Sequence, residues 1–281
     1  MPLYMAFVDL TKAFDTVCRP ALYKVLESIG CPPTLLSLII SFHEEMTACI
    51  QFDGSTSNSF SVNSGVKQGC VLAPTLFGIY FAALLRHAFL DSQDGIYIRT
   101  REDGSLYNLA RLKSKRYTTE ALIKDLLYAD DAAIVAHDND TLQHMMNNLS
   151  EACKLFSLTI SVKKTETLSQ GTEMPANITL NGEALKNVDK FTYLGSTISA
   201  SLNLDEELNS RIGKAATAFS KLGKRAWENK MLTIKTKVMI YQACVLTALL
   251  YGSESWTLYS NQEKKLNSFH MRCLRKLLKI K

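Results

Sequence analysis

Two neighbouring aspartates, Asp130 and Asp131, stand between the short apolar segments Leu126–Ala129 and Ala132–Ala136. Segments of this length and composition predict two strands, with the acids at the turn that joins them. Adjacent side chains on a regular strand point to opposite faces of a sheet, so two neighbouring acids serve one site most readily at a hairpin tip. Taken alone, however, the pair is more typical of a solvated turn, because Asp is a common turn residue.

A third acid changes this interpretation. Asp9 closes the apolar segment Met1–Leu10, which predicts a buried strand. A carboxylate is costly to bury without a cation or a hydrogen-bond donor beside it. Two or three carboxylates suit Mg²⁺, which prefers oxygen ligands, and their mutual repulsion favours a bound cation. Asp9, Asp130 and Asp131 are therefore candidate ligands for divalent metal.

The remaining pattern predicts an α+β fold followed by helices. Helices are expected at Leu22–Ile29, from Thr34, at Pro74–Ala88 and from Thr141, and strands at Cys49–Phe52, Phe60–Val62, Leu158–Val162, Ile178–Leu180 and Phe191–Leu194, with an exposed hairpin or loop between Asp91 and Glu120. After Gly195, the segments Asp205–Leu222 and Thr233–Leu250 and the basic tail beyond Asn261 have helical patterns. We therefore expect a mixed domain over residues 1–195 and a helical one over residues 196–281.

Composition narrows the function only weakly. The net charge of +5 permits a nucleic-acid partner without requiring one. Seven scattered cysteines without a CxxC pair indicate neither a disulfide framework nor a zinc cluster, which favours a reducing compartment. Asp9 and Lys12 interrupt any signal peptide, and the uncharged stretch Gln68–Leu85 carries Pro74, so it predicts a buried helix rather than a membrane span. We expect an intracellular protein, nuclear or cytoplasmic, that is not secreted and does not contact a membrane.

Five segments follow one another in the order of motifs A to E of reverse transcriptases, and they resemble most those of non-LTR, LINE-type retrotransposons. They are Phe7–Asp15 (motif A), Ser64–Pro74 (B), Tyr128–Asp131 (C), Leu158–Thr165 (D) and Phe191–Gly195 (E), and the family pattern continues to Tyr251–Trp256. The resemblance implies a polymerase palm over residues 1–195, with a small antiparallel sheet packed on helices. It implies an all-helical thumb and the start of a C-terminal extension over residues 196–281.

The resemblance also implies the chemistry. Asp9 and Asp130 would be the main ligands of two Mg²⁺ or Mn²⁺ ions, and Asp131 the third carboxylate. Two such ions can activate a primer 3′-hydroxyl and stabilise the leaving pyrophosphate. The implied activity is that of an RNA-directed DNA polymerase, with an RNA template, a DNA primer and dNTPs as partners.

Further residues take family roles, each with a structural alternative. Phe14 resembles the steric gate that excludes a ribose 2′-hydroxyl, but it could be a core Phe after a strand. Gln68 resembles the glutamine beside the incoming nucleotide, or it is a plain loop residue. Lys164 resembles the lysine near the triphosphate, or it is a surface lysine. Tyr193–Leu194–Gly195 would form the primer grip, or an ordinary turn.

Basic residues are frequent in the helical part. A thumb that follows a duplex needs them for phosphates, and the alternative is a solvated helix face. They are Arg211, Lys214, Lys221, Lys224, Arg225, Lys230, Lys235 and Lys237, with Trp227 among them.

The sequence departs from the family at its start. Asp9 lies only eight residues after Met1, whereas a fingers subdomain with triphosphate-binding residues precedes motif A in the family. We therefore expect the fingers to be missing and the isolated chain to be weak or inactive as a polymerase. The alternative function is that of a catalytically inactive, nucleic-acid-binding remnant of a decayed element.

Overall fold

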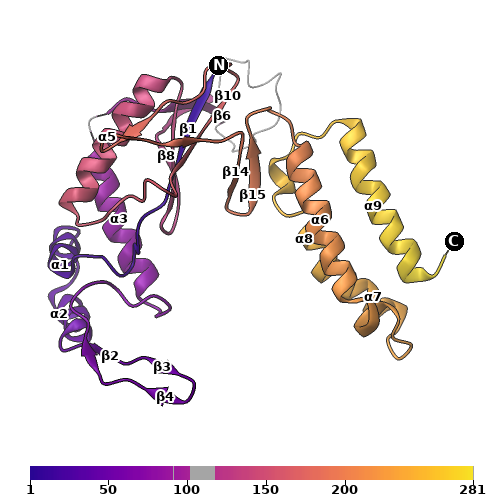
Figure 1. Cartoon of the computed structure of the whole chain (residues 1–281), viewed down its shortest axis with the longest axis horizontal. Helices are drawn as coiled ribbons and strands as arrows, with labels where there is room; N and C mark the ends of the chain where they lie inside the picture. The colour runs from indigo at the N-terminus through magenta and orange to yellow at the C-terminus, as the bar shows by residue number, and fades with distance from the viewer. Residues whose placement is uncertain (91, 102–117, 281) are drawn as a thin grey trace. The chain divides into compact units, whose positions relative to one another are not determined.

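A computed structural model describes residues 1–90, 92–101 and 118–280 of the chain (Figure 1). The chain divides into two compact units, Met1–Val188 and Asp189–Lys281. We call them the sheet unit and the helical unit and describe each by itself. Both helices and strands are present, as the sequence predicts.

A five-stranded sheet forms the centre of the sheet unit, in the order β13-β10-β1-β9-β8. These strands are β1 (Leu3–Val8), β8 (Asp125–Tyr128), β9 (Asp131–Ala136), β10 (Glu166–Gln170) and β13 (Lys186–Asn187). Neighbouring strands are antiparallel except β10 and β13. Strand β1 is central and buried from its second residue onward, which explains its continuous apolar sequence.

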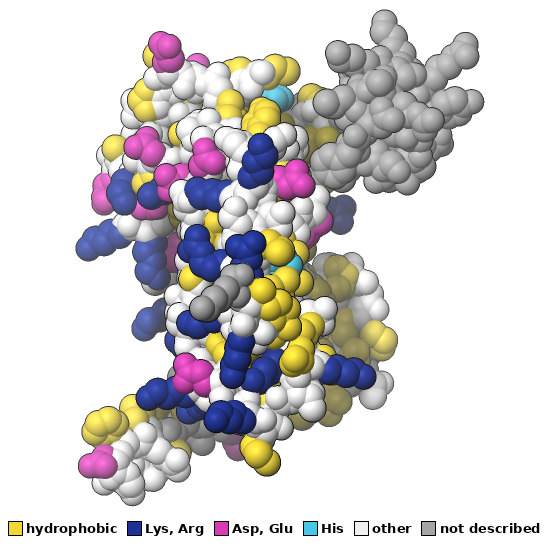
Figure 2. All heavy atoms as spheres, turned by 90° about the vertical axis from the view of Figure 1, so that its right-hand side faces the viewer, with side chains coloured by type: hydrophobic (Ala, Val, Ile, Leu, Met, Phe, Trp, Pro, Cys, Tyr) yellow, Lys and Arg dark blue, Asp and Glu magenta, His cyan; other side chains and the backbone are white. Residues whose placement is uncertain are grey.

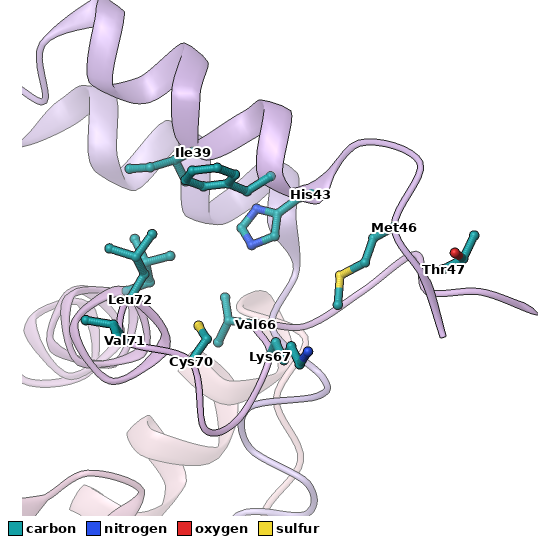
Figure 3. A pocket seen from close by; sticks show the side chains of 11 residues that line it. Ile39, His43, Met46, Thr47, Val66, Lys67, Cys70, Val71 and Leu72 are labelled. Carbon is teal, nitrogen blue, oxygen red and sulfur yellow. The ribbon is translucent and has the colours of Figure 1, made fainter. Parts of the chain in front are cut away.

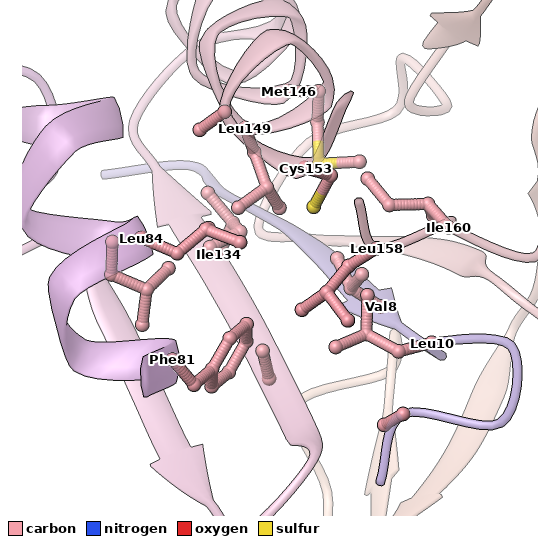
Figure 4. Packing of buried hydrophobic residues seen from close by; sticks show 14 of the residues in the cluster. Val8, Leu10, Phe81, Leu84, Ile134, Met146, Leu149, Cys153, Leu158 and Ile160 are labelled. Atoms are coloured by element: carbon pink, nitrogen blue, oxygen red, sulfur yellow. The ribbon is translucent and has the colours of Figure 1, made fainter. Parts of the chain in front are cut away.

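Two long helices, α3 (Ala73–Phe89) and α5 (Asn139–Leu155), pack against this sheet (Figure 1). Figure 4 shows Val8 and Ile134 from the strands among Phe81 and Leu84 of α3 and Leu149 of α5. Because side chains alternate along a strand, Val8 faces the helices and the next residue, Asp9, continues on the other face of the sheet. The predicted buried helix is thus confirmed for residues 73–85, while residues 68–72 of the uncharged stretch form the loop before it.

The rest of the sheet unit consists of two helices and small hairpins. The helices are α1 (Arg19–Ser28) and α2 (Pro33–His43); the pairs are β2 (Thr47–Ala48) with β5 (Phe60–Ser61), β3 (Gln51–Phe52) with β4 (Ser55–Thr56), β6 (Ile96–Arg101) with β7 (Thr118–Ile123), and β11 (Thr179–Leu180) with β12 (Glu183–Ala184). The predicted hairpin between Asp91 and Glu120 is present as β6 and β7, while positions 91 and 102–117 lie outside the described residues.

Two predicted helix starts and one predicted strand were wrong. Helix α2 begins at Pro33, a residue favoured at the first helical position, and not after Thr34. Helix α5 is capped by Asp138, whose carboxylate accepts a hydrogen bond from the backbone N–H of Thr141 at 2.7 Å. The segment Leu158–Val162 forms only an isolated bridge, between Ile160 and Leu10.

The helical unit opens with a hairpin. Its elements are β14 (Lys190–Tyr193), β15 (Ser196–Ser199), α6 (Asp205–Lys221), η1 (Gly223–Trp227), α7 (Ile234–Tyr241), η2 (Gln242–Leu246), α8 (Thr247–Leu249), η3 (Ser253–Ser255) and α9 (Ser260–Leu278). The prediction that residues after 195 are all-helical is therefore corrected, since β15 is a strand. The predicted boundary between the two domains, at residues 195 and 196, falls in the turn of this hairpin. The whole hairpin belongs to the helical unit, because β15 packs on α6.

No helix in residues 1–90, 92–101 and 118–280 combines the length and apolar character needed to cross a bilayer.

Candidate active site

The two neighbouring aspartates lie at the tip of the β8–β9 hairpin. Tyr128 pairs with Asp131, which leaves Ala129 and Asp130 as a two-residue turn. Ala129 has a φ of 55°, positive at the first turn position only, as in a type II′ turn. A residue with a Cβ adopts such a positive φ at a cost on the order of 1–3 kcal/mol. The expected hairpin tip is thus present, and its backbone is strained.

Asp9 meets this tip through the strand register. Strands β1 and β9 pair antiparallel up to Val8 and Ala132, and one further step sets Asp9 opposite Asp131. The two side chains therefore share the sheet face away from α3 and α5. The backbone of Asp9 is held in place because its carbonyl accepts a hydrogen bond from the N–H of Ser161 at 2.8 Å.

The acids influence one another electrostatically. Partial burial, with the carboxylates of Asp130 and Asp9, raises the pKa of Asp131 above its ordinary value. The Oδ1 atom of Asp9 is buried and accepts no hydrogen bond. A buried carboxylate oxygen without a donor, close to further acids, has the chemistry that a hard divalent cation satisfies. Within the described residues, however, no three acidic, His or Cys side chains converge into a ready-made metal cluster.

Lys164 lies beside the same carboxylate. Its Nζ lies 3.3 Å from Asp9 Oδ1, so the two groups form an ion pair, but their geometry is not that of a hydrogen bond. The Lys164 side chain is 70% exposed. The contact follows from register, because β1 pairs with β10 at Phe7 and Glu166, and two steps further Lys164 comes opposite Asp9. The sequence did not predict this ion pair.

Phe14 lies in the turn after β1. Its half-buried ring stacks on Phe77 of α3, with ring centroids 4.5 Å apart. The packing contact that the alternative interpretation predicts is therefore present, and part of the ring remains exposed.

A buried arginine organises the loop that contains Gln68. The Arg19 guanidinium donates to the carbonyls of Gly65, Val62, Ser64 and His43. Gly65 has a φ of +80°, and a Cβ there would lie 2.5 Å from the carbonyl oxygen of Asp15, so only glycine fits. Sequence reasoning missed Arg19, because the carbonyls that it binds are distant in the chain.

Two hollows lie near this loop. Gln68 is exposed and lines a cavity of about 540 Å³ with Arg19 and Asp15. Figure 3 shows a second, more apolar pocket of about 480 Å³, with Ile39 and His43 on one side and Cys70 and Leu72 on the other. The three aspartates line neither, so they are not brought together with Gln68 in one cavity.

The predicted primer-grip residues form the tip of the β14–β15 hairpin. Tyr193 pairs with Ser196, which leaves Leu194 and Gly195 as the turn. Their φ values of 48° and 83° are those of a type I′ turn. This tip belongs to the helical unit, whereas the three aspartates belong to the sheet unit.

Burial separates the basic residues into two groups. Arg211 and Lys237 are buried, and Lys237 donates to the carbonyl of Trp227, so neither alternative, a phosphate contact or a solvated helix face, is correct for these two. Trp227 is itself in the core, stacked on Phe219. The other predicted basic residues are exposed: Lys214, Lys221, Lys224, Arg225, Lys230 and Lys235.

Charge is divided unevenly between the two units. The helical unit contains 16 of the 32 Lys and Arg residues but only 7 of the 27 Asp and Glu residues, a formal charge of +9 against −4 for the sheet unit. Figure 2 shows many Lys and Arg side chains on the face that carries α9, and most of the Asp and Glu side chains in this view lie in its upper part. A surface of this kind favours a polyanionic partner.

Comparison with known proteins gives the family. Residues 2–198 match the family "Reverse transcriptase (RNA-dependent DNA polymerase)". An RNA-directed DNA polymerase from mobile element jockey of Drosophila funebris is 25% identical over 96% of this chain and 28% of its own length. A Pol polyprotein from the type-1 retrotransposable element R2 of Popillia japonica is 26% identical over 88% of this chain and 38% of its own.

Among solved structures, apo telomerase from Candida tropicalis aligns over 100% of this chain and 48% of its own, with a TM-score of 0.51 and 14% identity, a likeness of fold alone. The chain spans about 28% of the length of the jockey polymerases that it matches. The family match covers more than half of the chain and includes all three aspartates. The chain therefore belongs to the reverse transcriptase family and, within it, to the non-LTR retrotransposon type.

Proposed function

We propose that this chain supplies the palm, as the sheet unit, and the thumb, as the helical unit, of an RNA-directed DNA polymerase of a non-LTR retrotransposon. The observation that carries the proposal is the register that sets Asp9 opposite Asp131, with Asp130 in the adjoining turn, inside the segment that matches the family. The reaction is transfer of a nucleotide from a dNTP to a primer 3′-hydroxyl on an RNA template.

The carboxylates of Asp9, Asp130 and Asp131 would hold two divalent ions, Mg²⁺ or Mn²⁺, and the donorless Oδ1 of Asp9 fits that role. Such ions, when bound, lower the pKa of the attacking hydroxyl and neutralise charge on the leaving pyrophosphate. Lys164, beside Asp9, is close enough to supply positive charge to the triphosphate. The exposed part of the Phe14 ring would exclude a ribose 2′-hydroxyl, and Gln68 would contact the nucleotide.

The charge of the helical unit supports a nucleic-acid partner. Its exposed basic side chains can bind phosphates without reading base sequence. A telomerase of similar fold, from Candida tropicalis, has been solved with a fragment of telomeric RNA. An RNA template paired with a DNA primer is the partner that we propose for this surface.

Primer extension tests the catalytic assignment. Because the isolated chain is expected to be a weak polymerase, it should extend a DNA primer on an RNA template only slowly with dNTPs and Mg²⁺ or Mn²⁺, and the assay needs the protein in excess over the primer. Asp9→Asn and Asp130→Asn should each lower the rate by about 100-fold or more, because the charge that holds the cations is lost. Asp140→Asn, on the exposed first turn of α5, is the matched control and should extend like the unaltered chain. Product that survives Asp130→Asn would refute the assignment.

Salt dependence tests the binding surface separately. The logarithm of the affinity for an RNA–DNA duplex should fall linearly with the logarithm of salt concentration, by roughly 0.9 per phosphate neutralised. Replacing Lys221, Lys224 and Arg225 with Ala should make the slope shallower, whereas Lys24→Ala with Lys154→Ala, exposed on the sheet unit, should not. Salt-dependent binding without extension would favour the inactive remnant instead.

A further inference from the structure

Side chains of the helical unit bind both carbonyls of the Leu194–Gly195 turn. The Tyr251 hydroxyl donates to the carbonyl of Leu194 at 2.9 Å. The Arg211 guanidinium and the Lys214 ammonium, at 3.2 Å, both donate to the carbonyl of Gly195. The two carbonyls of the turn are thus held by three donors, two from α6 and one from Tyr251.

Two of these donors, Arg211 and Tyr251, belong to a network built around a buried ion pair. Arg211 Nε lies 2.6 Å from Glu207 Oε1, and the two side chains are 5% and 2% exposed. The second carboxylate oxygen of Glu207 accepts a hydrogen bond from the backbone N–H of Thr197, in β15, at 2.6 Å. The Arg211 guanidinium carbon also lies 4.5 Å from the centre of the Tyr251 ring. The network therefore joins α6, Tyr251 and both ends of the turn.

The turn needs such support. Leu194 has a φ of 48°, which a residue with a Cβ adopts only at an energetic cost, and such strain persists where the surroundings fix it. Gly252 brings the chain close beneath Ser196: it has a φ of +78°, and a Cβ there would lie 3.0 Å from the Ser196 hydroxyl. Tyr251 and Gly252 open the 251–256 segment, for which the proposed function supplies no role.

The backbone N–H groups of the turn are donors that a ligand could use. Within the described part of the chain, no acceptor binds the backbone N–H groups of Leu194 and Gly195. Backbone N–H groups are common donors to nucleic-acid phosphates. The carbonyl of Leu194 is bound to Tyr251, but the residue as a whole is still 39% exposed and can contact a ligand.

We propose that Glu207, Arg211 and Tyr251 are positioning residues for the primer terminus. They hold the Leu194–Gly195 turn by its carbonyls, so that its N–H groups and the Leu194 side chain present one fixed surface to the primer backbone. The inference rests on the proposed function, which assigns this turn to the primer grip. It adds the residues that act through the turn without touching the primer.

Tyr251→Phe tests the proposal with the smallest change, since it removes one hydroxyl and keeps the ring over Arg211. Tyr241→Phe is the matched control: its hydroxyl also makes one hydrogen bond, to His270 Nδ1 at 2.8 Å, in the core of the same unit. The probe is an RNA template paired with a DNA primer that ends in 4-thiothymidine. After irradiation, trypsin should release the turn within peptide 191–211, where mass spectrometry measures the crosslink.

The unaltered chain should crosslink within peptide 191–211. In Tyr251→Phe the crosslink yield should fall severalfold, and kcat for extension should fall about 10-fold as the primer end is misplaced. Its KM for the duplex should stay within about twofold, because the phosphate contacts that set duplex affinity remain. Tyr241→Phe should leave the crosslink yield and kcat unchanged, even if it lowers thermal stability as much as Tyr251→Phe does.

The outcomes separate the two claims. If the unaltered chain crosslinks or extends, but Tyr251→Phe and Tyr241→Phe behave alike, the positioning role is wrong and the proposed function stands. If the unaltered chain neither extends the primer nor crosslinks to it, the proposed function fails and the inference fails with it. A crosslink confined to other peptides would refute the role of the turn.

Discussion

At Asp9, a carboxylate lies between another acid, Asp131, and the ammonium group of Lys164. The two neighbours have opposite effects on the binding of a divalent ion at Asp9. The negative charge of Asp131 favours a bound cation, whereas Lys164 already places a positive charge beside Asp9. A divalent ion that binds Asp9 must compete with this ammonium group. Lys164 thus has a second effect at the same carboxylate, besides its proposed contact with the triphosphate.

The competition can be measured with Mn²⁺ alone, without nucleotide. We expect Lys164→Ala to tighten Mn²⁺ binding, by up to about fivefold, since an exposed ion pair is worth roughly 0–1 kcal/mol. Lys163→Ala, its exposed neighbour, is the control and should change the affinity less. Electron paramagnetic resonance of free Mn²⁺ gives the binding curve. Unchanged or weaker Mn²⁺ binding by Lys164→Ala would show that the pair with Asp9 is not important in solution.

Sequence patterns identified the acids but not their supports. Asp9 and Asp130–Asp131 stand at the ends of apolar strands, a signal that is local in sequence. Arg19 and the Glu207–Arg211 pair support the loops by binding backbone carbonyls, which come near these side chains only when the chain is folded. The misassigned phosphate contacts, Arg211 and Lys237, have a related cause: a sequence shows a charge but not its burial.

At the scale of elements, helix α5 illustrates how a cap depends on pH. The backbone N–H of Thr141 donates to the Asp138 carboxylate and holds the pKa of Asp138 below its ordinary value. Because the folded-state pKa is the lower one, the stabilisation is complete above the unfolded-state pKa, about 3.9, and is lost as pH falls through the folded value.

Asp138→Ala should therefore destabilise the chain by about 1 kcal/mol at pH 7. The difference should persist to about pH 5 and shrink below about pH 4, where the carboxyl group of the unaltered chain becomes protonated. Urea unfolding across this pH range measures it. Asp138→Asn keeps a capping oxygen and is the control. At neutral pH it should lower the free energy of unfolding less than Asp138→Ala does. A deficit for Asp138→Ala that stays constant down to pH 3 would contradict the role of the charge.

Elements with strong periodicity were predicted well, and those decided by long-range pairing were not. The helices of Pro74–Ala88 and Asp205–Leu222 have continuous apolar faces, and the structure contains both. Strand β10 escaped prediction because its sequence, Glu166–Gln170, is mostly polar. It becomes a strand by pairing with the central strand β1, a partner more than 150 residues away in the chain.

At the scale of the whole molecule, the division at Val188 predicts where the chain can be cut. A fragment of residues 189–281 keeps the β14–β15 hairpin, whereas one of residues 196–281 removes the carbonyls that Arg211 and Tyr251 bind. The shorter fragment should be less stable by at least about 1 kcal/mol, since buried donors lose their acceptors. That difference corresponds to roughly 4–8 °C in Tm for a unit of this size. Thermal unfolding followed by circular dichroism compares the two fragments. Equal Tm values would place the boundary between the two units after the β14–β15 hairpin.

The unequal charge of the two units has a consequence for how the chain is handled. Its sequence pI of about 8.7 averages an acidic part and a strongly basic one. On immobilised heparin, retention should be set by residues 189–281, and it should persist at a pH where the chain as a whole carries almost no net charge. Elution salt then reports the state of one unit, and damage confined to the other would pass unnoticed on such a column.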